Sequence, residues 1–235
     1  MFACINVEQS YSQDFIVLPS TAMAGCIHVV RHAESVHNTD HDFSRLDPEL
    51  TALGRQQAED FGRIFPSSDE VGLIVTSPLR RTIQTTLLAF ANVLDKRYFD
   101  EDSGKGVDGG AELVLDPGLQ ERSSLPCDTG SDQLVLEKIF PSLDFSRLHE
   151  GWQLKEGLYS PDAVDDRASS VRRSLADRVV ALQDRKRRDI AVVTHGVFMK
   201  HLSGDPQIDL PKAGWRTYTI KQDDGGSVVL APIGP

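Results

Sequence analysis

Short apolar runs alternate with amphipathic segments from residue 27 onward, a pattern typical of strands that alternate with helices. Apolar runs predict buried strands at residues 27–30, 71–76, 112–115 and 190–194. Two further β-like runs, 217–220 and 228–230, flank an Asp-Asp-Gly-Gly turn near the end of the chain. This order predicts an α/β fold, a three-layer sandwich in which helices flank a mainly parallel central sheet.

Helices are predicted where apolar residues recur at helical spacing behind a capping residue. The segment 51–65 places Leu53, Ala58, Phe61 and Phe65 on one face, with Thr51 as its cap. Ser-Pro pairs open two more helices, because Ser caps a helix and Pro fits its first position. The remaining helices are expected at 78–95, near 131–140, from 161 to about 183, and at 197–202.

The chain reads as a single domain with one addition at its start. Residues 1–25 show neither the helical nor the strand spacing of apolar residues, which indicates a loose extension or an edge strand. Met23 is a second candidate start beside Met1. Residues 26–235 form the predicted domain, without an internal repeat or a linker. Within it, the irregular segment 121–160 is expected to be an insertion or lid, and 97–110 a surface loop.

Composition narrows the classes of partner. The 235 residues hold 25 Lys and Arg against 35 Asp and Glu, a net charge of −10, and no basic tract. Such a surface disfavours nucleic acid and anionic membranes. No apolar run reaches membrane-spanning length, and the first residues lack the features of a secretory signal. Oligomeric state does not follow from the sequence.

The cysteines point to a reducing, cytoplasmic setting. Cys4, Cys26 and Cys127 are widely spaced and odd in number, so they do not form a complete disulfide framework. No Cys-x-x-Cys pair suggests zinc or redox chemistry. Neither a metal nor another cofactor is therefore expected.

Chemistry-bearing residues follow the predicted parallel strands, whose carboxyl ends are where open α/β sheets bind ligands. These residues are Arg31-His32 after the first strand, Arg80-Arg81 after the second, Glu121 after the third and His195 after the fourth. Arginine matches phosphate oxygens with permanently charged planar donors. Histidine can attack phosphorus through a covalent intermediate, and a carboxyl can protonate the departing oxygen. The set predicts a phosphoryl site.

Four sequence blocks carry a resemblance to the histidine phosphatase superfamily, in its phosphoglycerate-mutase-like branch. The first is Arg31-His32-Ala33-Glu34-Ser35-Val36-His37-Asn38. The next are Leu50-Thr51-Ala52-Leu53-Gly54-Arg55-Gln56-Gln57-Ala58 and Ser77-Pro78-Leu79-Arg80-Arg81-Thr82-Ile83-Gln84-Thr85, followed by Thr194-His195-Gly196. They occur in the family's order and span residues 27–200, most of the chain.

The resemblance implies a metal-independent phosphatase that acts on a small phosphomonoester. His32 is implied as the nucleophile that becomes phosphohistidine. Arg31, Arg81 and His195 are implied to bind the transferring phosphoryl group, with Asn38 at its rim and His195 also counted as catalytic. Glu121 is the implied proton donor, because the family's acid stands in a Leu-x-Glu context after the third strand; Asp128 is the alternative.

Two other functions stay open. A phosphoglycerate-mutase-type phosphotransferase shares the first half-reaction, but the mutase pattern continues with Arg-His-Tyr-Gly, where this chain has Arg122-Ser123-Ser124-Leu125-Pro126. A catalytically weak phospho-ligand binding protein is the second alternative, which the complete set of histidines and arginines disfavours. Substrate specificity is expected to reside in residues 121–160 and 97–110.

Several nearby residues have simpler explanations. His28, His32, His37 and His41 share no face on a strand and loop, so a metal cluster is not expected. Arg80 points about 100° away from Arg81 on a helix, which predicts a surface ion pair for Arg80. Trp152 and Phe140 either line the substrate pocket or form the lid's own small core.

Overall fold

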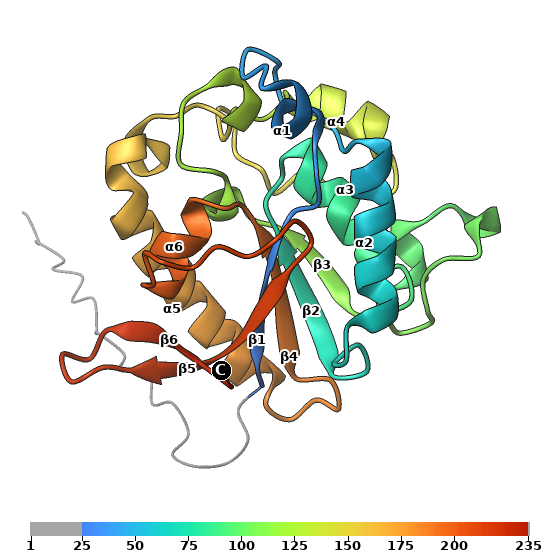
Figure 1. Cartoon of the computed structure of the whole chain (residues 1–235). Helices are drawn as coiled ribbons and strands as arrows, with labels where there is room; N and C mark the ends of the chain where they lie inside the picture. Colours follow the sequence, from blue (N-terminus) through green and yellow to red (C-terminus); the bar gives the residue numbers. More distant parts are fainter. Residues whose placement is uncertain (1–24, 235) are drawn as a thin grey trace, which may run out of the picture.

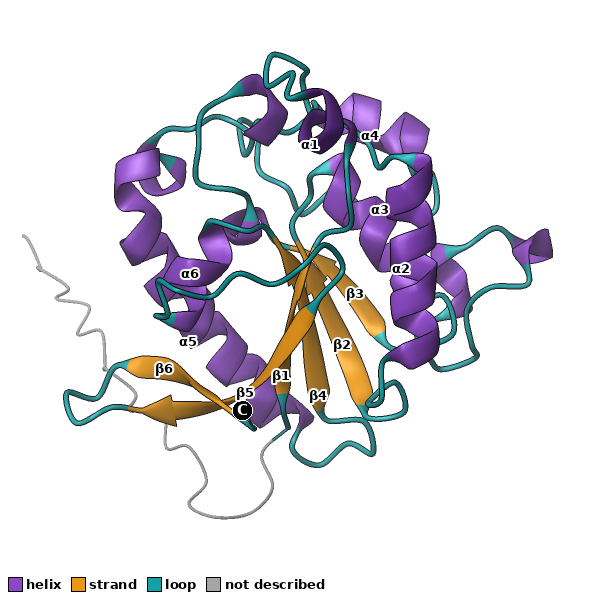
Figure 2. Cartoon of the chain, in the orientation of Figure 1, coloured by secondary structure: helices purple, strands orange, loops and turns teal. Residues whose placement is uncertain are grey.

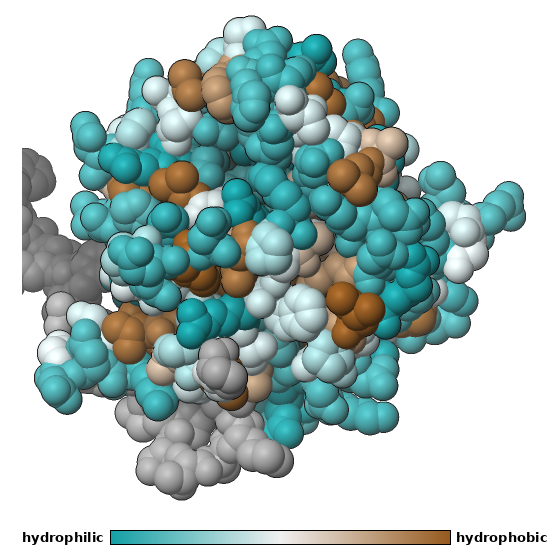
Figure 3. Space-filling view, in the orientation of Figure 1, coloured by the Kyte–Doolittle hydropathy of each residue, from teal (hydrophilic) through white to brown (hydrophobic). Residues whose placement is uncertain are grey.

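A computed structural model describes residues 25–234 of the chain. The predicted N-terminal extension and the choice between Met1 and Met23 lie outside the described residues, so these and the domain boundary at residue 26 stay predictions. Within residues 25–234, no helix is long and apolar enough to cross a membrane. The face seen in Figure 3 is largely hydrophilic, with apolar residues scattered over it in small groups.

A six-stranded mixed sheet lies at the centre of the molecule, in the order β3-β2-β4-β1-β5-β6 (Figure 2). Strands β1 to β4 are parallel, whereas β5 is antiparallel to β1 and β6 is antiparallel to β5. The strands are β1 Ile27–Arg31, β2 Val71–Thr76, β3 Glu112–Leu115, β4 Asp189–Thr194, β5 Trp215–Gln222 and β6 Val228–Pro232. Every predicted strand is confirmed, and the mainly parallel α/β sandwich is confirmed with it.

Helices cover both faces of this sheet, with α2 and α3 on one side and α5 and α6 on the other (Figure 1). The helices are α1 Val36–Asp40, α2 Ala52–Ile64, α3 Arg80–Ala89, α4 Gln133–Ile139, α5 Val164–Leu182 and α6 Phe198–Ser203. An apolar core lies at each interface between the sheet and a layer of helices, one under α5 and α6 and the other under α2. Burial of both sheet faces explains why the central parts of the parallel strands β1, β2 and β4 are mostly apolar.

Helix α2 begins as predicted, but the prediction that Leu53 lies on its buried face is wrong. The Thr51 hydroxyl accepts a hydrogen bond from the Gly54 N–H at 2.9 Å, the expected cap. Leu53, however, is 57% exposed. The buried positions are Gly54, Ala58, Phe61 and Phe65, whose spacings of four, three and four keep them on one helical face. Leu53 lies five residues before Ala58 and therefore projects elsewhere.

Helix α3 is shorter than its predicted range of 78–95. It begins at Arg80 behind Leu79 and ends at Ala89. The helix ends early because Leu94 and Asp95 form isolated β-bridges with Ala111 and Val107, which requires extended backbone after the turn. The long helix likewise opens with one 3₁₀ turn before α5 proper begins at Val164.

The register of the parallel strands brings their carboxyl ends to one edge of the sheet. Arg31 of β1 pairs with Thr194 of β4, so the following residues, His32 and His195, leave the sheet side by side. Thr76 of β2 pairs with Val193, one residue earlier on β4. The last residue of β3, Leu115, is in turn opposite Thr76.

The segment 121–160 has a small apolar core of its own. It is irregular, as predicted, with the single helix α4 and several short 3₁₀ turns. Trp152 and Phe140 belong to this core, which packs on Leu79 and Ile83 at the start of α3. Gly130 leaves room for the Trp152 ring, because a Cβ there would come within 2.1 Å of it. Of the two alternatives for Trp152 and Phe140, the structure thus shows the lid's own core.

Candidate active site

A cleft of about 350 Å³ opens at the carboxyl edge of the sheet. Its lining joins residues from four distant parts of the chain. It includes all the predicted site residues except His195, which lies buried directly behind it. The lining residues are Arg31, His32, His37, Asn38, Phe43, Arg81, Glu121, Ser123, Leu125, Cys127, Asp128, Gly196, Val197, Lys200, Asp209 and Lys212.

His32 directly follows β1, and its two ring nitrogens have different partners. Nδ1 lies 2.7 Å from the Ala33 carbonyl oxygen and so must donate its proton there. Nε2 accepts a hydrogen bond from Nε of Arg81 at 3.3 Å and therefore carries a lone pair. Burial, and then the charges of Arg81 and Lys212, hold the pKa of His32 well below its usual value. A neutral imidazole with an unprotonated Nε2 is the form that can act as a nucleophile, once the hydrogen bond from Arg81 passes to the phosphoryl group.

His195 stands beside His32, with the two ring centres 5.2 Å apart. Its Nδ1 accepts from Nη2 of Arg81 at 3.0 Å, so its proton is on Nε2, which donates to the Ser77 hydroxyl at 2.9 Å. Burial, and then the charge of Arg81, also lower the pKa of His195 well below its usual value. Both histidines are thus neutral and held by hydrogen bonds.

Arg81 connects the parts of the site. Besides the two histidines, its guanidinium donates to the Cys127 carbonyl at 2.6 Å and forms an ion pair with Asp128 at 2.8 Å. The side chain is 1% exposed, so it is held in one position. Arg80 instead bonds Glu49 at 3.0 Å, which confirms the predicted surface ion pair.

Arg31 reaches the cleft from the last position of β1. Its Nη1 donates to Asp209 at 3.0 Å and to the Leu210 carbonyl oxygen. The guanidinium lies over Gly196, where a Cβ would be only 3.1 to 3.2 Å from three of its atoms. Glycine after His195 therefore lets the arginine plane approach the chain closely.

Asn38 lies at the rim, on the short helix α1. The His37 Nδ1–H donates to the Ser35 hydroxyl at 2.9 Å, and that hydroxyl donates to Oδ1 of Asn38 at 3.1 Å. The Asn38 amide donates to Nε2 of His37 at 3.0 Å, which closes the ring. His37 was expected on a loop, but it lies on α1 and is buried against the cleft.

Glu121 faces the cleft from the loop after β3. Oε1 accepts backbone N–H groups of Arg122 at 2.7 Å and Phe198 at 2.9 Å, and Oε2 accepts that of Val197 at 3.0 Å. Its carbonyl oxygen accepts from Nζ of Lys155 at 2.8 Å. The side-chain carboxyl group is therefore fixed by three backbone N–H groups, and the backbone of Glu121 is fixed by Lys155.

Asp128, the alternative acid, has both oxygens engaged, Oδ1 with Arg81 and Oδ2 with the Ser123 hydroxyl at 2.6 Å. Among the described residues, His37, Cys127 and Asp128 offer ligand atoms within 4.8 Å of one another. Both His37 nitrogens are hydrogen-bonded, however, and burial raises the pKa of the Cys127 thiol to about 11. These contacts oppose metal binding, and the absence of a metal requirement stays a prediction.

Three cationic residues in or near the cleft belong to none of the four sequence blocks. Lys155 has its pKa lowered to about 7, first by burial and then by Arg167. Arg167 is fully buried, lies over the Phe198 ring and donates to the Gln120 carbonyl at 2.8 Å. Lys212 lines the cleft itself. Arg167 and Lys155 come from α5 and the irregular segment, so only the tertiary fold brings them to Glu121.

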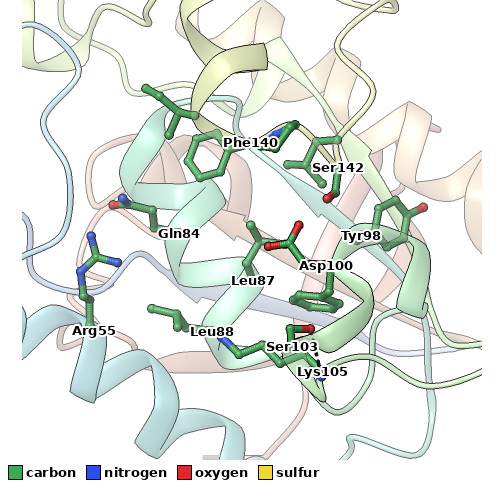
Figure 4. A pocket seen from close by; sticks show the side chains of 14 residues that line it. Arg55, Gln84, Leu87, Leu88, Tyr98, Asp100, Ser103, Lys105, Phe140 and Ser142 are labelled. Carbon is green, nitrogen blue, oxygen red and sulfur yellow. Dashed lines mark hydrogen bonds between the residues drawn. The ribbon is translucent and has the colours of Figure 1, made fainter.

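A second hollow of about 360 Å³ is lined by residues of α3 and of the segments 98–105 and 139–143 (Figure 4). Its floor is apolar around Leu87, Leu88 and Phe140, with Arg55 and Lys105 at its margin. It holds neither of the buried histidines and none of the predicted site residues. The phosphoryl chemistry therefore belongs to the cleft at the sheet edge.

The fold and the cleft together define a class: an α/β protein with a neutral histidine and two arginines at the carboxyl edge of its sheet. The chain belongs to the histidine phosphatase superfamily (branch 1), whose family model matches residues 27–231. A probable phosphatase of Schizosaccharomyces pombe is 30% identical over 178 residues, covering 73% of this chain and 74% of the relative. A phosphoglycerate mutase-like protein of Arabidopsis thaliana is 26% identical over 208 residues, covering 75% and 72%.

Two solved structures have a similar fold. A structure called mycobacterial hydrolase 1 superimposes with a TM-score of 0.54 at 20% identity, covering 90% of this chain and 98% of the other. A mycobacterial glucosyl-3-phosphoglycerate phosphatase gives a TM-score of 0.52 at 20% identity, covering 89% and 98%. These likenesses show the fold.

Proposed function

We propose that the chain is a phosphatase that hydrolyses a small phosphomonoester through a phosphohistidine at His32, without a metal. The observation that carries this proposal is the state of His32. It lines the cleft as a neutral imidazole, with an unprotonated Nε2 that accepts from Arg81 and with Nδ1 held by a carbonyl oxygen. Arg81 supplies permanent positive charge beside that nitrogen, and Arg31 supplies it in the same cleft, which is what phosphoryl transfer requires of a protein.

The reaction has two steps. Nε2 of His32 attacks phosphorus, the bond from phosphorus to the ester oxygen breaks, and the departing oxygen takes a proton from Glu121. A water molecule then gives a proton to the Glu121 carboxylate while its oxygen attacks phosphorus, which releases inorganic phosphate and restores His32. Arg31 and Arg81 bind the phosphoryl oxygens in both steps, and Asn38 assists at the rim. His195 joins them in its other tautomer, in which Nδ1–H donates to a phosphoryl oxygen and Nε2 accepts from the Ser77 hydroxyl.

Glu121 is the better placed of the two acids. Its Oε2 accepts only one backbone N–H, so a second lone pair on that oxygen can hold a proton. Asp128 is committed to the ion pair with Arg81, and protonation would break that pair. We therefore keep Glu121 as the proton donor.

Substituting each acid tests this assignment. Glu121→Gln is expected to lower kcat on an alkyl phosphate about 100-fold, and on an aryl phosphate far less, because a phenolate leaves without a proton. Asp128→Asn is the matched comparison, and it should affect both esters alike through Arg81. Equal losses on both esters in Glu121→Gln, with a selective loss in Asp128→Asn, would reverse the roles.

Product analysis separates hydrolysis from transfer. The protein is incubated with 3-phosphoglycerate and a 2,3-bisphosphoglycerate primer, and both inorganic phosphate and the 2-phospho isomer are measured. A phosphatase releases phosphate without rapid isomerisation. Rapid isomerisation with little free phosphate would establish a mutase instead, and binding without turnover of any ester would indicate a phospho-ligand binding protein.

A small phosphorylated molecule is the proposed partner, with neither nucleic acid nor membrane involved, and the proposed setting is cytoplasmic. The cleft is small, and the net charge of −10 repels long polyanions. The two described cysteines, Cys26 and Cys127, are both free, which suits a reducing compartment. Fractionation of tagged protein, with a cytosolic marker as reference, tests the setting.

A further inference from the structure

Two cations that line the cleft form no ion pair within residues 25–234. The arginines there are each paired with a carboxylate, Arg81 with Asp128 and Arg31 with Asp209. The other two cationic residues that line the cleft are Lys200 of α6 and Lys212 of the turn before β5. Neither ammonium group forms a hydrogen bond or an ion pair within residues 25–234. An unpaired cation in a half-buried cleft is costly unless a ligand supplies the anion.

Lys212 is the one whose position is tied to the nucleophile. It lies in the turn Pro211–Gly214, just before β5. The Ala213 N–H donates to the carbonyl oxygen of His32 at 3.4 Å, and the Arg31 N–H donates to that of Gly214 at 2.9 Å. Ala213 adopts a φ of 58°, in the left-handed region, which turns the chain sharply at this point. The turn therefore holds Lys212 next to the backbone of the reacting histidine.

The electrostatics place its ammonium group near the same centre. Burial, and then Arg31 and Arg81, lower the pKa of Lys212 to about 8, against the opposing charges of Glu121 and Glu34. In return, Lys212 lowers the pKa of both His32 and His37. The charged and titratable groups that face it are Arg31 of β1, His32 and Glu34 after it, His37 of α1, Arg81 of α3 and Glu121 after β3.

We propose that Lys212 is a further phosphoryl-binding residue, whose ammonium group binds a non-bridging oxygen of the phosphoryl group as it moves to and from His32. This proposal rests on the proposed function and adds a third cation to it. Because Asp128 and Asp209 are ion-paired with Arg81 and Arg31, the unpaired ammonium of Lys212 has more of its charge available to the phosphoryl oxygens than either guanidinium has. Of the two unpaired lysines, it is the one whose turn is tied to the His32 backbone. Lys212 acts in its protonated form and transfers neither a proton nor a phosphoryl group.

A substrate pair separates this role from recognition of a second acidic group elsewhere on the substrate. 2-Hydroxyethyl phosphate and phosphoglycolate differ only in a CH₂OH or a carboxylate beyond the ester. Lys212→Met should lower kcat/KM by about 10- to 100-fold on both, and Lys212→Arg should recover part of the loss. Lys221→Met, at an exposed position of β5, is the matched control and should match the wild type. A loss confined to phosphoglycolate, or no loss, overturns the proposal.

The pH profile separates binding of the phosphoryl group from a structural effect. Wild-type kcat/KM should fall as pH rises through about 8, because the ammonium group loses its proton and its charge. Lys212→Met should lack this component, so that the wild-type and variant values converge near pH 10. Lys155 titrates in both proteins, so its effect cancels in the ratio of wild-type to variant kcat/KM. A gap of constant size from pH 7 to 10 contradicts the proposal.

Calorimetry with inorganic phosphate keeps this proposal separate from the proposed function. If wild-type protein hydrolyses no ester, the phosphatase assignment fails, yet weaker phosphate binding by about tenfold in Lys212→Met still supports the lysine as a phosphoryl ligand. If the wild type hydrolyses esters and Lys212→Met binds phosphate as tightly as the wild type does, the lysine proposal alone fails.

Discussion

The two sides of the cleft are built in different ways. On one side, β1, β4 and the start of α3 place His32, His195 and Arg81 through sheet register and buried hydrogen bonds. On the other side, the segment 121–160 is held by its own small core and by long-range polar contacts. Buried Asp47 links the two sides, since its carboxylate accepts the backbone N–H of Arg80 and of Ser131, both at 2.9 Å.

This difference suggests a division of labour between the two sides. The edge of the sheet fixes atoms that must face phosphorus, and a displacement there changes the chemistry itself. Five residues between positions 121 and 128 line the cleft, so this side is the one that we expect to contact the alcohol part of the proposed ester substrate. The first three predictions below test that division, and the fourth tests the chemistry at the sheet edge.

Sequence patterns predicted the first side well for a physical reason. Apolar strands, Ser and Thr caps and the chemistry of strand ends are local signals, and parallel register then dictates that Arg31-His32 meets Thr194-His195. The second side was predicted only as irregular. Lys155 and Arg167 reach Glu121 through tertiary packing across more than 30 residues of chain, as their hydrogen bonds show. No local pattern encodes such a contact.

The errors have the same origin. Leu53 was assigned to the buried face of α2 because it is apolar, whereas Gly54 occupies that position and lets the helix approach the chain at Glu34. The end of α3 was placed too late because the bridges made by Leu94 and Asp95 involve residues beyond the local window. Lys212 was missed because its turn lies outside every recognised block.

Removing Arg81 is expected to have the largest effect. Arg81→Met should lower kcat/KM about 1,000-fold or more, because the side chain contacts both histidines and carries charge to the phosphoryl oxygens. Arg80→Met is the matched control, one residue away on α3, and should stay within about threefold of wild type because it removes only a surface ion pair. Steady-state kinetics on an aryl phosphate measure both. Comparable losses in the two variants would remove the distinction between the arginines.

A methyl group at Gly196 is expected to act on the same side with a smaller effect. Gly196→Ala should displace the Arg31 guanidinium, which lies 3.1 to 3.2 Å from the new Cβ, and lower kcat/KM about tenfold. Gly225→Ala, in the turn between β5 and β6, adds the same methyl group at an ordinary 3.4 Å contact and should be neutral. Unchanged kinetics in Gly196→Ala would show that the position of Arg31 is not critical.

A methyl group in the core of segment 121–160 should affect stability more than chemistry. Gly130→Ala would push on the Trp152 ring and is expected to lower the free energy of unfolding by about 1–3 kcal/mol. At a temperature where the variant is folded, kcat on an aryl phosphate should stay within about threefold of wild type, while KM rises for bulkier esters. Urea denaturation and steady-state kinetics provide the two readouts. A loss of kcat as large as that of Arg81→Met would contradict the division between the two sides.

The most direct measurement is to trap the covalent intermediate. Protein mixed with an aryl phosphate and quenched within milliseconds should carry at most one phosphoryl group per chain, on the peptide that contains His32, stable in alkali and labile in acid as a phosphohistidine is. His32→Ala should show neither the label nor turnover, and circular dichroism should show its fold intact. Turnover by a folded His32→Ala variant at the wild-type rate, or a label on any other residue, would contradict the central claim.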